Sequence, residues 1–370
     1  EINDNDTILD LSDNETFVEY FFDDTLNIPQ KKQVLLRRML LGLTSYYPID
    51  RSSIVDMPTV NKPSSIPVVY EDYNIVKDIN VVPCYMSSIQ WTAYEQQYVK
   101  EKLKKLNQLR KKDMYDDQKS DFSIRTRQNS NIVYDDNSFI FEKDESKKQE
   151  AYRRMLDSGN FTYDRNLKLY SPKFYEILTN LNKLIDENDT PTGKALYYSD
   201  FRHESGSEAF SQILIANGYE EYDHTQKDIQ ELVSEGSKKK RFTYLTGKES
   251  QEIRKLNKDA FNSKENMRGE YIQLILISSA GAEGISLACV RQVHIMEPFW
   301  NYIRIDQVFG RAIRIGSHKD LPPDERNVDE YLYLAALPEG DTVEELFQTL
   351  KASNWPELTD INYEENIKLK

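Results

Sequence analysis

Four residues near the end of the chain carry side chains that suit binding to a phosphate group. They are Gln307, Gly310, Arg311 and Arg314. Their spacing of i, i+3, i+4 and i+7 predicts one stripe on a helix expected over residues 302–314. Guanidinium groups are always charged and hold phosphate oxygens in a fork. Because glycine costs about 1 kcal/mol inside a helix, Gly310 indicates that another group approaches closely. We therefore favour a phosphate contact over an ordinary solvated helix face.

A glycine-rich turn upstream is a second candidate site for phosphate. It follows the apolar run 271–279, which predicts a strand buried on both faces, and it includes Ser278, Ser279, Gly281 and Gly284. In a parallel sheet such a turn lies at the carboxyl edge, where ligands bind. Glycines there let backbone N–H groups approach phosphate. Tight packing also needs glycine, so taken alone the turn fits either explanation.

Alternating helices and strands are expected to position both sites. Ser171 has the properties of an N-cap, Pro172 of a first-turn residue, and Gly218 of a helix stop. The periodicity predicts helices over 171–188, 205–219 and 249–263, and strands over 194–201, 241–247, 271–279, 291–298 and 330–337. Such strands, apolar throughout and separated by helices, predict an α/β fold with a parallel sheet covered by helices on both faces.

The remainder of the chain divides by composition. We expect an acidic, partly disordered segment over 1–30 and a mixed segment of helices and short strands over 31–112. A polar insertion or loop is expected over 113–150, the α/β domain over 165–350 and a C-terminal extension over 351–370.

Composition limits the classes of function. The 370 residues are 39% hydrophobic with a net charge of −14, and no run of about 18 apolar residues could span a bilayer. Cys84 and Cys289 are the only cysteines, so neither disulfides nor a zinc site is expected, and the histidines lack metal-ligand spacing. Two basic tracts, 100–112 and 238–241, fit solvated faces or contacts to nucleic-acid phosphates, and both readings stay open.

Several segments resemble superfamily 2 helicases, most closely the Snf2-like branch and the NTPases of large cytoplasmic DNA viruses. The segments GAEGISL, EPFWN and QVFGRAIRIG resemble motifs V and VI, and KALYYSDFRHESG resembles motif IV. The resemblance is specific over about 170–340. It implies the second RecA-like domain of a helicase, with ATP and Mg²⁺ as cofactors and DNA or RNA as partner.

The resemblance also implies roles for individual residues. Arg311 and Arg314 would be arginine fingers, and Gln307 would join them in catalysis. Nucleotide-binding positions would be Gly281, Glu283, Gly284 and Gly310, and nucleic-acid-binding positions would be Ser278, Ser279, Ser199, Arg202 and Gly247. Ser286 stands where Snf2-like proteins usually have asparagine, which leaves the polar contact at that position open.

Two parts of a helicase engine are missing from the sequence. No GxxxxGK[ST] loop occurs, since Gly193-Lys194 is followed by Ala195, and no acidic DExx pair follows a buried strand. We therefore expect the C-terminal portion of a longer enzyme, inactive alone, whose upstream RecA-like domain holds ATP and Mg²⁺. The resemblance places it in the host cytoplasm, viral factories or virions, with viral RNA polymerase among its partners. The alternative is a non-catalytic docking module for polymerase or virion proteins.

Overall fold

The computed structural model describes most of the second half of the chain and parts of the first. The described residues are 20–23, 28–30, 32–34, 36, 57–63, 66–72, 75–111, 124–134, 145–203, 205–223, 228–246, 249–278, 285–299 and 302–338. Residues 1–54 and 55–370 form two compact units. In the first unit, residues 20–21, 30, 32–34 and 36 are helical. The second unit holds the sheet.

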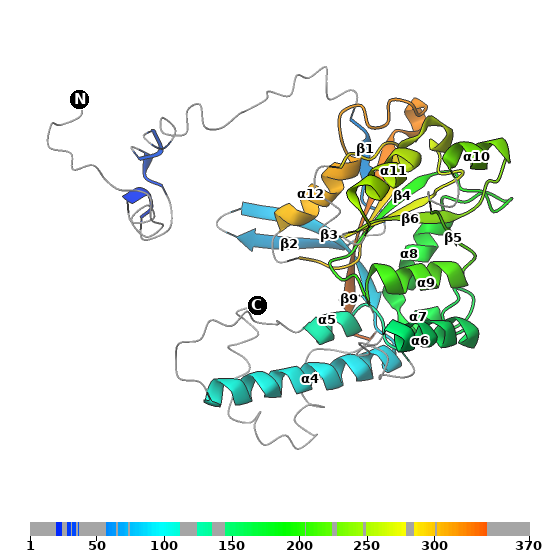
Figure 1. The fold of residues 1–370 in the computed structure, drawn as a ribbon. Coiled ribbons are helices and arrows are strands. Elements are labelled where there is room, and N and C mark those ends of the chain that lie inside the picture. The colour runs from blue at the N-terminus through cyan, green and yellow to red at the C-terminus, as the bar shows by residue number, and fades with distance from the viewer. Residues whose placement is uncertain are drawn as a thin grey trace. The chain divides into compact units, whose positions relative to one another are not determined.

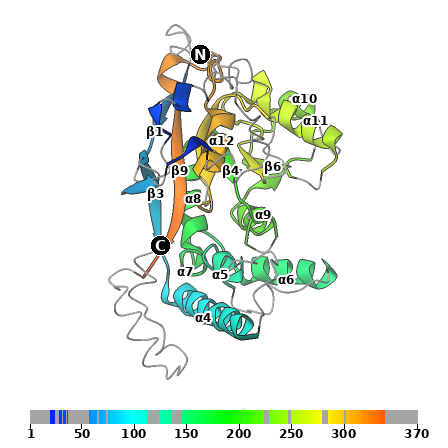
Figure 2. The same cartoon turned by 90° about the vertical axis from the view of Figure 1, so that its left-hand side faces the viewer.

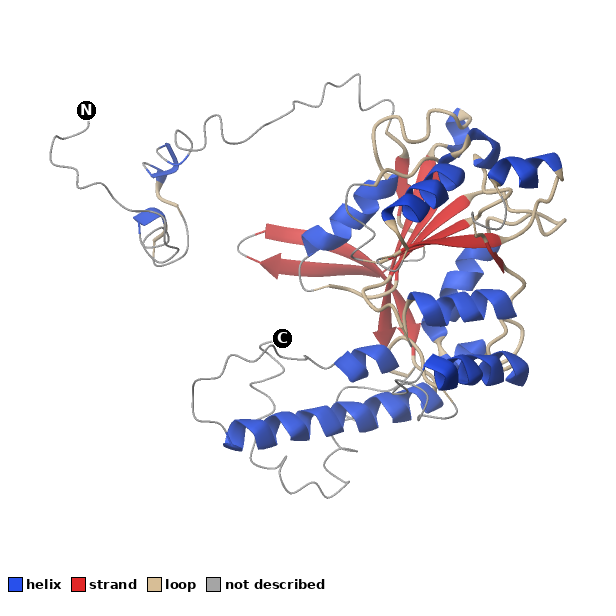
Figure 3. Cartoon of the chain, viewed as in Figure 1, coloured by secondary structure: helices blue, strands red, loops and turns tan. Residues whose placement is uncertain are grey.

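One twisted sheet of nine strands organises the second unit (Figures 1 and 3). Its order is β2-β3-β9-β8-β4-β7-β6-β5, and β1 also pairs with β9. The strands are β1 (Thr59–Asn61), β2 (Ile66–Asp72), β3 (Ile75–Tyr85), β4 (Lys194–Tyr198), β5 (Glu220–Glu221), β6 (Arg241–Leu245), β7 (Leu274–Ile277), β8 (Val290–Ile295) and β9 (Asn327–Ala336). Every pair is parallel except the β2–β3 hairpin. The expected parallel sheet is confirmed.

Helices cover both faces of this sheet. The helices are α4 (Ser88–Lys111), α5 (Ile124–Asn129), α6 (Glu145–Ser158), α7 (Leu167–Tyr170), α8 (Pro172–Asn182), α9 (Ser207–Ala216), α10 (Ile229–Ser234), α11 (Gln251–Asn262) and α12 (Tyr302–Ala312). Residues of α8 and α9 share one buried cluster, and residues of α10, α11 and α12 share the other. Within β4, Tyr197 belongs to the first cluster and Leu196 and Tyr198 to the second, because successive side chains of a strand point to opposite faces.

Local signals in the sequence mark the start of α8 and the stop after α9 correctly, whereas α8 ends at Asn182, earlier than the expected residue 188. The Ser171 hydroxyl accepts a hydrogen bond from the backbone N–H of Phe174 (3.1 Å), which caps α8. Gly218, just after α9, has a φ of +83°, a backbone angle that glycine adopts without strain. Among the described residues, no helix is long and apolar enough to cross a membrane.

Strands from the first third of the chain extend the sheet. β9 pairs with β1 through residues 327–329 and with β3 through residues 333–336. The segment 31–112 therefore supplies strands to the same sheet as the domain expected over 165–350. The hairpin of β2 and β3 projects from the edge of this sheet (Figures 1 and 3). The domain boundaries themselves stay a prediction.

The prediction of a polar insertion or loop over 113–150 is wrong in part. This segment contains α5 and the start of α6, and between them Asn131, Ile132, Val133 and Tyr134 are buried. Four residues are too few to show a periodic pattern, so this burial could not be predicted from the sequence. Figures 1 and 2 show α4, α5, α6 and α7 grouped at one end of the unit.

Candidate functional site

The carboxyl ends of three adjacent parallel strands lie at one edge of the sheet. Tyr198 of β4 pairs with Ile277 of β7 and with Ile295 of β8. Ser199 directly follows β4, Ser278 directly follows β7, and Glu297 follows β8 after one intervening residue. This edge is where an open α/β sheet binds ligands, and most residues predicted from the sequence follow one of these strands.

Helix α12 packs on this part of the fold with one face. Ile305, Val308 and Ala312 are buried in its apolar face, while Gln307 is exposed on the other. A Cβ atom added at Gly310 would meet no heavy atom of the described chain within 4 Å. The close neighbour that this glycine predicts is therefore not supplied by the described residues, and the surface above it has room for another molecule or domain.

The helix ends earlier than expected, so the predicted stripe of four residues is wrong in one member. α12 stops at Ala312, two residues before Arg314. The Arg314 guanidinium turns back and donates from Nε to the Gly310 carbonyl oxygen (2.8 Å). Carbonyl groups in the last turn of a helix have no partner within the helix, and this contact provides one for Gly310. Gln307, Gly310 and Arg311 share the helix, and Arg314 is fixed beside its end.

The end of α12 lies against the segment that follows the glycine-rich turn. The backbone N–H of Leu287 donates to the Arg311 carbonyl oxygen (3.0 Å), and Nη1 of Arg314 donates to the Ser286 hydroxyl. The structure thus places the end of α12 against residues that follow the glycine-rich turn in the sequence. It also shows that the hydroxyl at position 286 takes up a polar contact. Ser279, Gly281, Glu283 and Gly284 lie outside the described residues.

Ser199 and Ser278 are less accessible than a contact to nucleic acid requires. Ser199 is fully buried; its hydroxyl donates to Oε1 of Glu297 (2.7 Å) and accepts from the N–H of Phe201 (3.1 Å). Ser278 is 7% exposed. The geometry thus gives Ser199 the task of fixing the turn after β4, and its expected direct contact is not supported. Arg202 is partly exposed, with Nε 3.5 Å from a carboxylate oxygen of Glu208. Gly247 lies outside the described residues.

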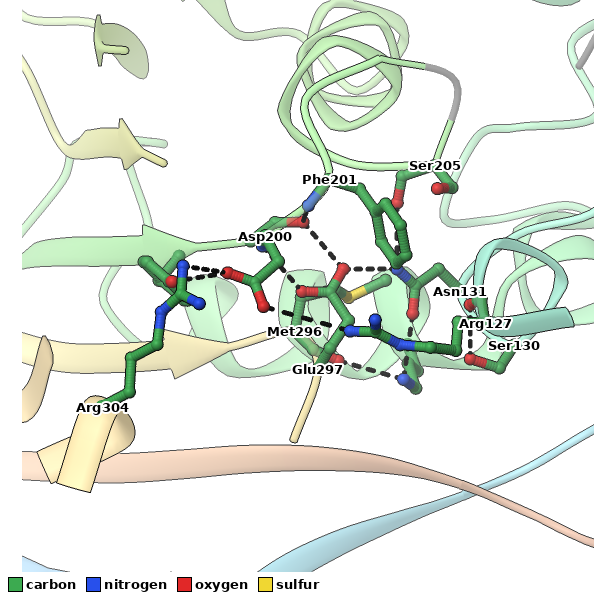
Figure 4. A network of polar contacts seen from close by, with 12 residues as sticks. Arg127, Ser130, Asn131, Asp200, Phe201, Ser205, Met296, Glu297 and Arg304 are labelled. Carbon is green, nitrogen blue, oxygen red and sulfur yellow. Dashed lines mark hydrogen bonds and ion pairs between the residues drawn. The ribbon is translucent and has the colours of Figure 1, made fainter. Parts of the chain in front are cut away.

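A buried polar network lies at this edge and was not predicted from the sequence (Figure 4). The Glu297 carboxylate accepts from the Ser199 hydroxyl, the Asp200 N–H and the Asn131 side-chain amide. Burial raises the pKa of Glu297 to about 7, although the nearby Lys173 ammonium opposes this. Lys173 is itself buried and donates to Oδ1 of Asn131 and to the Met296 carbonyl oxygen, both at 3.0 Å. Burial lowers the pKa of Lys173. A glutamate directly after a buried strand was the one available signal.

Asp200 lies between two arginines on the solvent side of this network (Figure 4). Its carboxylate is 2.8 Å from Nη2 of Arg304 on α12 and 4.0 Å from Nη2 of Arg127 on α5. It also accepts from the Tyr198 hydroxyl at 2.7 Å. Asp200 therefore connects the end of β4 to helices that are remote from each other in sequence.

Lys194 and the possible metal ligands are the remaining groups that could bind a phosphate or a metal ion. Lys194 begins β4, at the amino end of the strand, and its buried ammonium donates to the Phe261 carbonyl oxygen (2.9 Å). Burial lowers the pKa of Lys194 to about 8. The part of the chain that the structure describes contains no group of three or more His, Cys, Asp or Glu residues able to hold a metal ion.

Part of this chain matches a known protein family, and the chain is similar to several viral proteins. Residues 178–316 match the family model described as the helicase conserved C-terminal domain. The chain is 33% identical over 255 residues to a putative ATP-dependent RNA helicase of Acanthamoeba polyphaga mimivirus, covering 69% of this chain and 39% of that protein. It is 30% identical over 375 residues to a termination factor NPH-I homolog of African swine fever virus, covering 90% and 49%. The chain thus spans half or less of the length of these relatives.

Solved structures with a related arrangement are more distant. One is the C-terminal part of the Fun30 ATPase domain, with 16% identity, a TM-score of 0.38, and coverage of 80% of this chain and 90% of that one. Another is the SWI2/SNF2 ATPase core of Sulfolobus solfataricus in complex with dsDNA, with 16% identity, a TM-score of 0.37 and coverage of 93% and 55%.

Proposed function

Because this chain belongs to the superfamily 2 helicases of the Snf2-like, viral kind through its conserved C-terminal domain, we propose that it forms one side of the ATP site of a nucleic-acid helicase or translocase. One observation carries the proposal. Arg311 and Arg314 lie directly against Ser286 and Leu287, the segment that leaves the glycine-rich turn at the carboxyl edge. The Arg314 guanidinium and the backbone of Arg311 thus contact residues that follow, in the sequence, a turn of a kind that suits phosphate.

The two arginines have the chemistry of arginine fingers. ATP, when bound, supplies the phosphoryl group to be transferred. Arg311 and Arg314 would neutralise the charge that develops on this group, an effect of about 10³–10⁵ in rate where such fingers are known. Gln307 and the open surface at Gly310 would let another domain close over the site. Holding Arg314 by Gly310 and Ser286 reduces the reorganisation that this role requires.

The proposal assigns the phosphate-binding loop and Mg²⁺ to a different RecA-like domain of the same protein. The nearest sequence match to such a loop, Gly193-Lys194, begins a strand at its amino end, and Lys194 is engaged with Phe261. This chain would then complete the site when the two domains close, and would not hydrolyse ATP alone. Opening and closing would move the protein along DNA or RNA.

The biological setting is also a proposal. Relatives carry the names termination factor NPH-I homolog and early transcription factor large subunit homolog, both from African swine fever virus. These names support a role in viral transcription or genome processing. We propose that the chain acts in the host cytoplasm, viral factories or virions, with viral RNA polymerase among its partners.

Steady-state ATPase measurements on the natural protein that carries this chain together with its ATP-binding domain test the proposal. Arg311→Ala and Arg314→Ala are each expected to lower kcat by about 10³-fold with little change in affinity for nucleic acid. Arg153→Ala is the control, since Arg153 is exposed on α6 and pairs with Asp157. Unchanged turnover in both site variants would contradict the proposal and favour a non-catalytic docking module.

A further inference from the structure

Arg127 and Arg304 approach one carboxylate from two sides. Arg304 of α12 forms a close ion pair with Asp200, whereas Nη2 of Arg127 stays 4.0 Å away, beyond the reach of a hydrogen bond. The side chain of Arg304 is 34% exposed, that of Arg127 is 30% exposed, and that of Asp200 is 15% exposed. Two guanidinium groups facing one carboxylate leave one positive charge in excess at this point of the carboxyl edge.

Each of these arginines also lies over an aromatic ring. The Arg127 guanidinium is 5.0 Å from the ring centre of Phe201, and that of Arg304 is 4.2 Å from the ring centre of Phe299. A guanidinium that contacts a ring with its face keeps its N–H donors in the plane, where they can meet phosphate oxygens. Stacking also limits the rotamers of the side chain, so that less freedom remains to be lost on binding.

The buried network holds α5 at this edge. Asn131, two residues after α5, donates through its amide to Glu297 and to the Ser205 carbonyl oxygen, and accepts from Lys173. Ser171 donates from its hydroxyl to the Asn131 backbone carbonyl oxygen. The helix that carries Arg127 is thus tied to the turn after β4, although it lies outside the residues that match the helicase family.

We propose that Arg127 and Arg304 form a binding site for the phosphates of a nucleic-acid backbone, with Asp200 as an internal counter-ion that the phosphate displaces. The inference rests on the proposed function for the identity of the ligand. It assigns part of the nucleic-acid track to α5, a helix outside the family's motifs.

The surrounding charges favour an anion at this place. Arg125 on α5 is exposed, and Arg202 and His203 follow the turn after β4. Among the described residues, the acids with contacts at this edge are Asp200, Glu101, Glu208 and the buried Glu297. Glu101 accepts hydrogen bonds from the N–H of Arg125 and the hydroxyl of Thr126, and Glu208 pairs with Arg202 and His203. In a chain with a net charge of −14, such a concentration of arginines marks a specific place for phosphate.

Fluorescence anisotropy with a labelled single-stranded oligonucleotide tests the site on the 370-residue chain itself. Each lost phosphate contact should reduce the slope of log affinity against log salt concentration by about 0.7 to 1. Arg127→Ala and Arg304→Ala are expected to show this reduction and weaker binding. Arg127→Lys should keep the slope and lose part of the affinity, because lysine keeps the charge without the fork. Arg153→Ala, an arginine on α6, is the control.

Asp200→Asn gives a result of opposite sign. Asparagine keeps an oxygen that can accept from Tyr198 but removes the charge that competes with phosphate. We expect affinity to rise roughly fivefold at low salt. If Asp200 only stabilises the fold, its substitution should weaken binding, and that result would overturn the proposal. DNA and RNA probes of one sequence show which backbone is preferred.

The outcome is independent of the arginine fingers. If Arg127→Ala and Arg304→Ala bind with the slope of the unchanged chain, the phosphate site is rejected, whatever the ATPase measurements on Arg311 and Arg314 give. A chain that binds no oligonucleotide at any salt concentration would reject the site as well. Reduced slopes beside unaffected turnover in the finger variants would retain the site and reject the proposed function.

Discussion

At the scale of single residues, Arg311 and Arg314 are held in different ways. The carbonyl oxygen of Arg311 is engaged by Leu287, whereas the guanidinium of Arg314 contacts Gly310 and Ser286. A guanidinium held by neutral acceptors has no carboxylate partner to offset its positive charge. Arg314 is therefore the better pre-organised of the two for contact with a phosphate supplied from outside the described chain.

Two buried ionisable residues, His294 within β8 and Glu297 just after it, make stability depend on pH in opposite directions. His294 is fully buried between Tyr333 and Gln292, and burial lowers its pKa to about 3. Between pH 6.5 and about 3, the unfolded chain binds a proton on His294 that the folded chain does not bind. The free energy of unfolding therefore falls as the pH falls through this range. Glu297, whose pKa is raised to about 7, keeps its proton in the fold above pH 4.5, so its contribution is lost as pH rises from 4.5 to 7.

The opposite pH dependences of His294 and Glu297 give a prediction for Glu297→Gln. Removing the carboxyl leaves the histidine effect, so stability should rise more steeply from pH 5 to pH 7 than in the unchanged chain, by about 2 kcal/mol. Urea unfolding at the two pH values measures the difference. His294→Gln should change the dependence in the opposite sense. Equal slopes for Glu297→Gln and the unchanged chain would show that Glu297 is ionised in the fold throughout this range.

At the scale of elements, Asn131 connects α5 to the sheet. Its amide lies between the ammonium of Lys173 and the carboxylate of Glu297, and it satisfies one charged group on each side. Buried charges that lose a hydrogen-bond partner are costly, because water cannot replace it. The contact of α5 with the carboxyl edge therefore depends on a residue that is not charged itself.

Asn131→Ala is expected to lower the free energy of unfolding by about 3 kcal/mol. Urea denaturation measures this change, and Asn182→Ala at an exposed position should stay within about 0.5 kcal/mol of the unchanged chain. A loss for Asn131→Ala no larger than that of the control would mean that water or rearranged side chains take over its hydrogen bonds.

The same elements show what the sequence could and could not predict. The strands β4, β6, β7, β8 and β9, the Ser171 cap and the stop at Gly218 follow from local periodicity and backbone preference, and their places in the chain were predicted correctly, although β4 and β7 are shorter than expected. The end of α12 was not, because it depends on hydrogen bonds from Arg314 and Leu287 to the last turn. The burial of Asn131 and Lys173 depends on partners up to 166 residues away, and polar residues are assigned to the surface by default.

At the scale of the whole described fold, the sheet combines strands from distant parts of the chain. β9 is bordered by β8 on one side and by β1 and β3 on the other. The carboxyl edge of this sheet then carries two basic surfaces. One contains Arg311 and Arg314 beside Ser286 and Leu287, and the other contains Arg127 and Arg304 around Asp200. We assign the first to a nucleotide and the second to a nucleic-acid backbone.

The most direct test of the central claim compares binding of ADP with binding of ADP and aluminium fluoride, a mimic of the transferring phosphoryl group. In a protein that carries this chain together with the ATP-binding domain proposed above, the mimic should bind far more tightly than ADP. Arg311→Ala or Arg314→Ala should remove most of this difference, about 10³-fold, and leave the affinity for ADP unchanged. If both variants retain the full preference for the mimic, the arginines do not reach the nucleotide and the account is wrong.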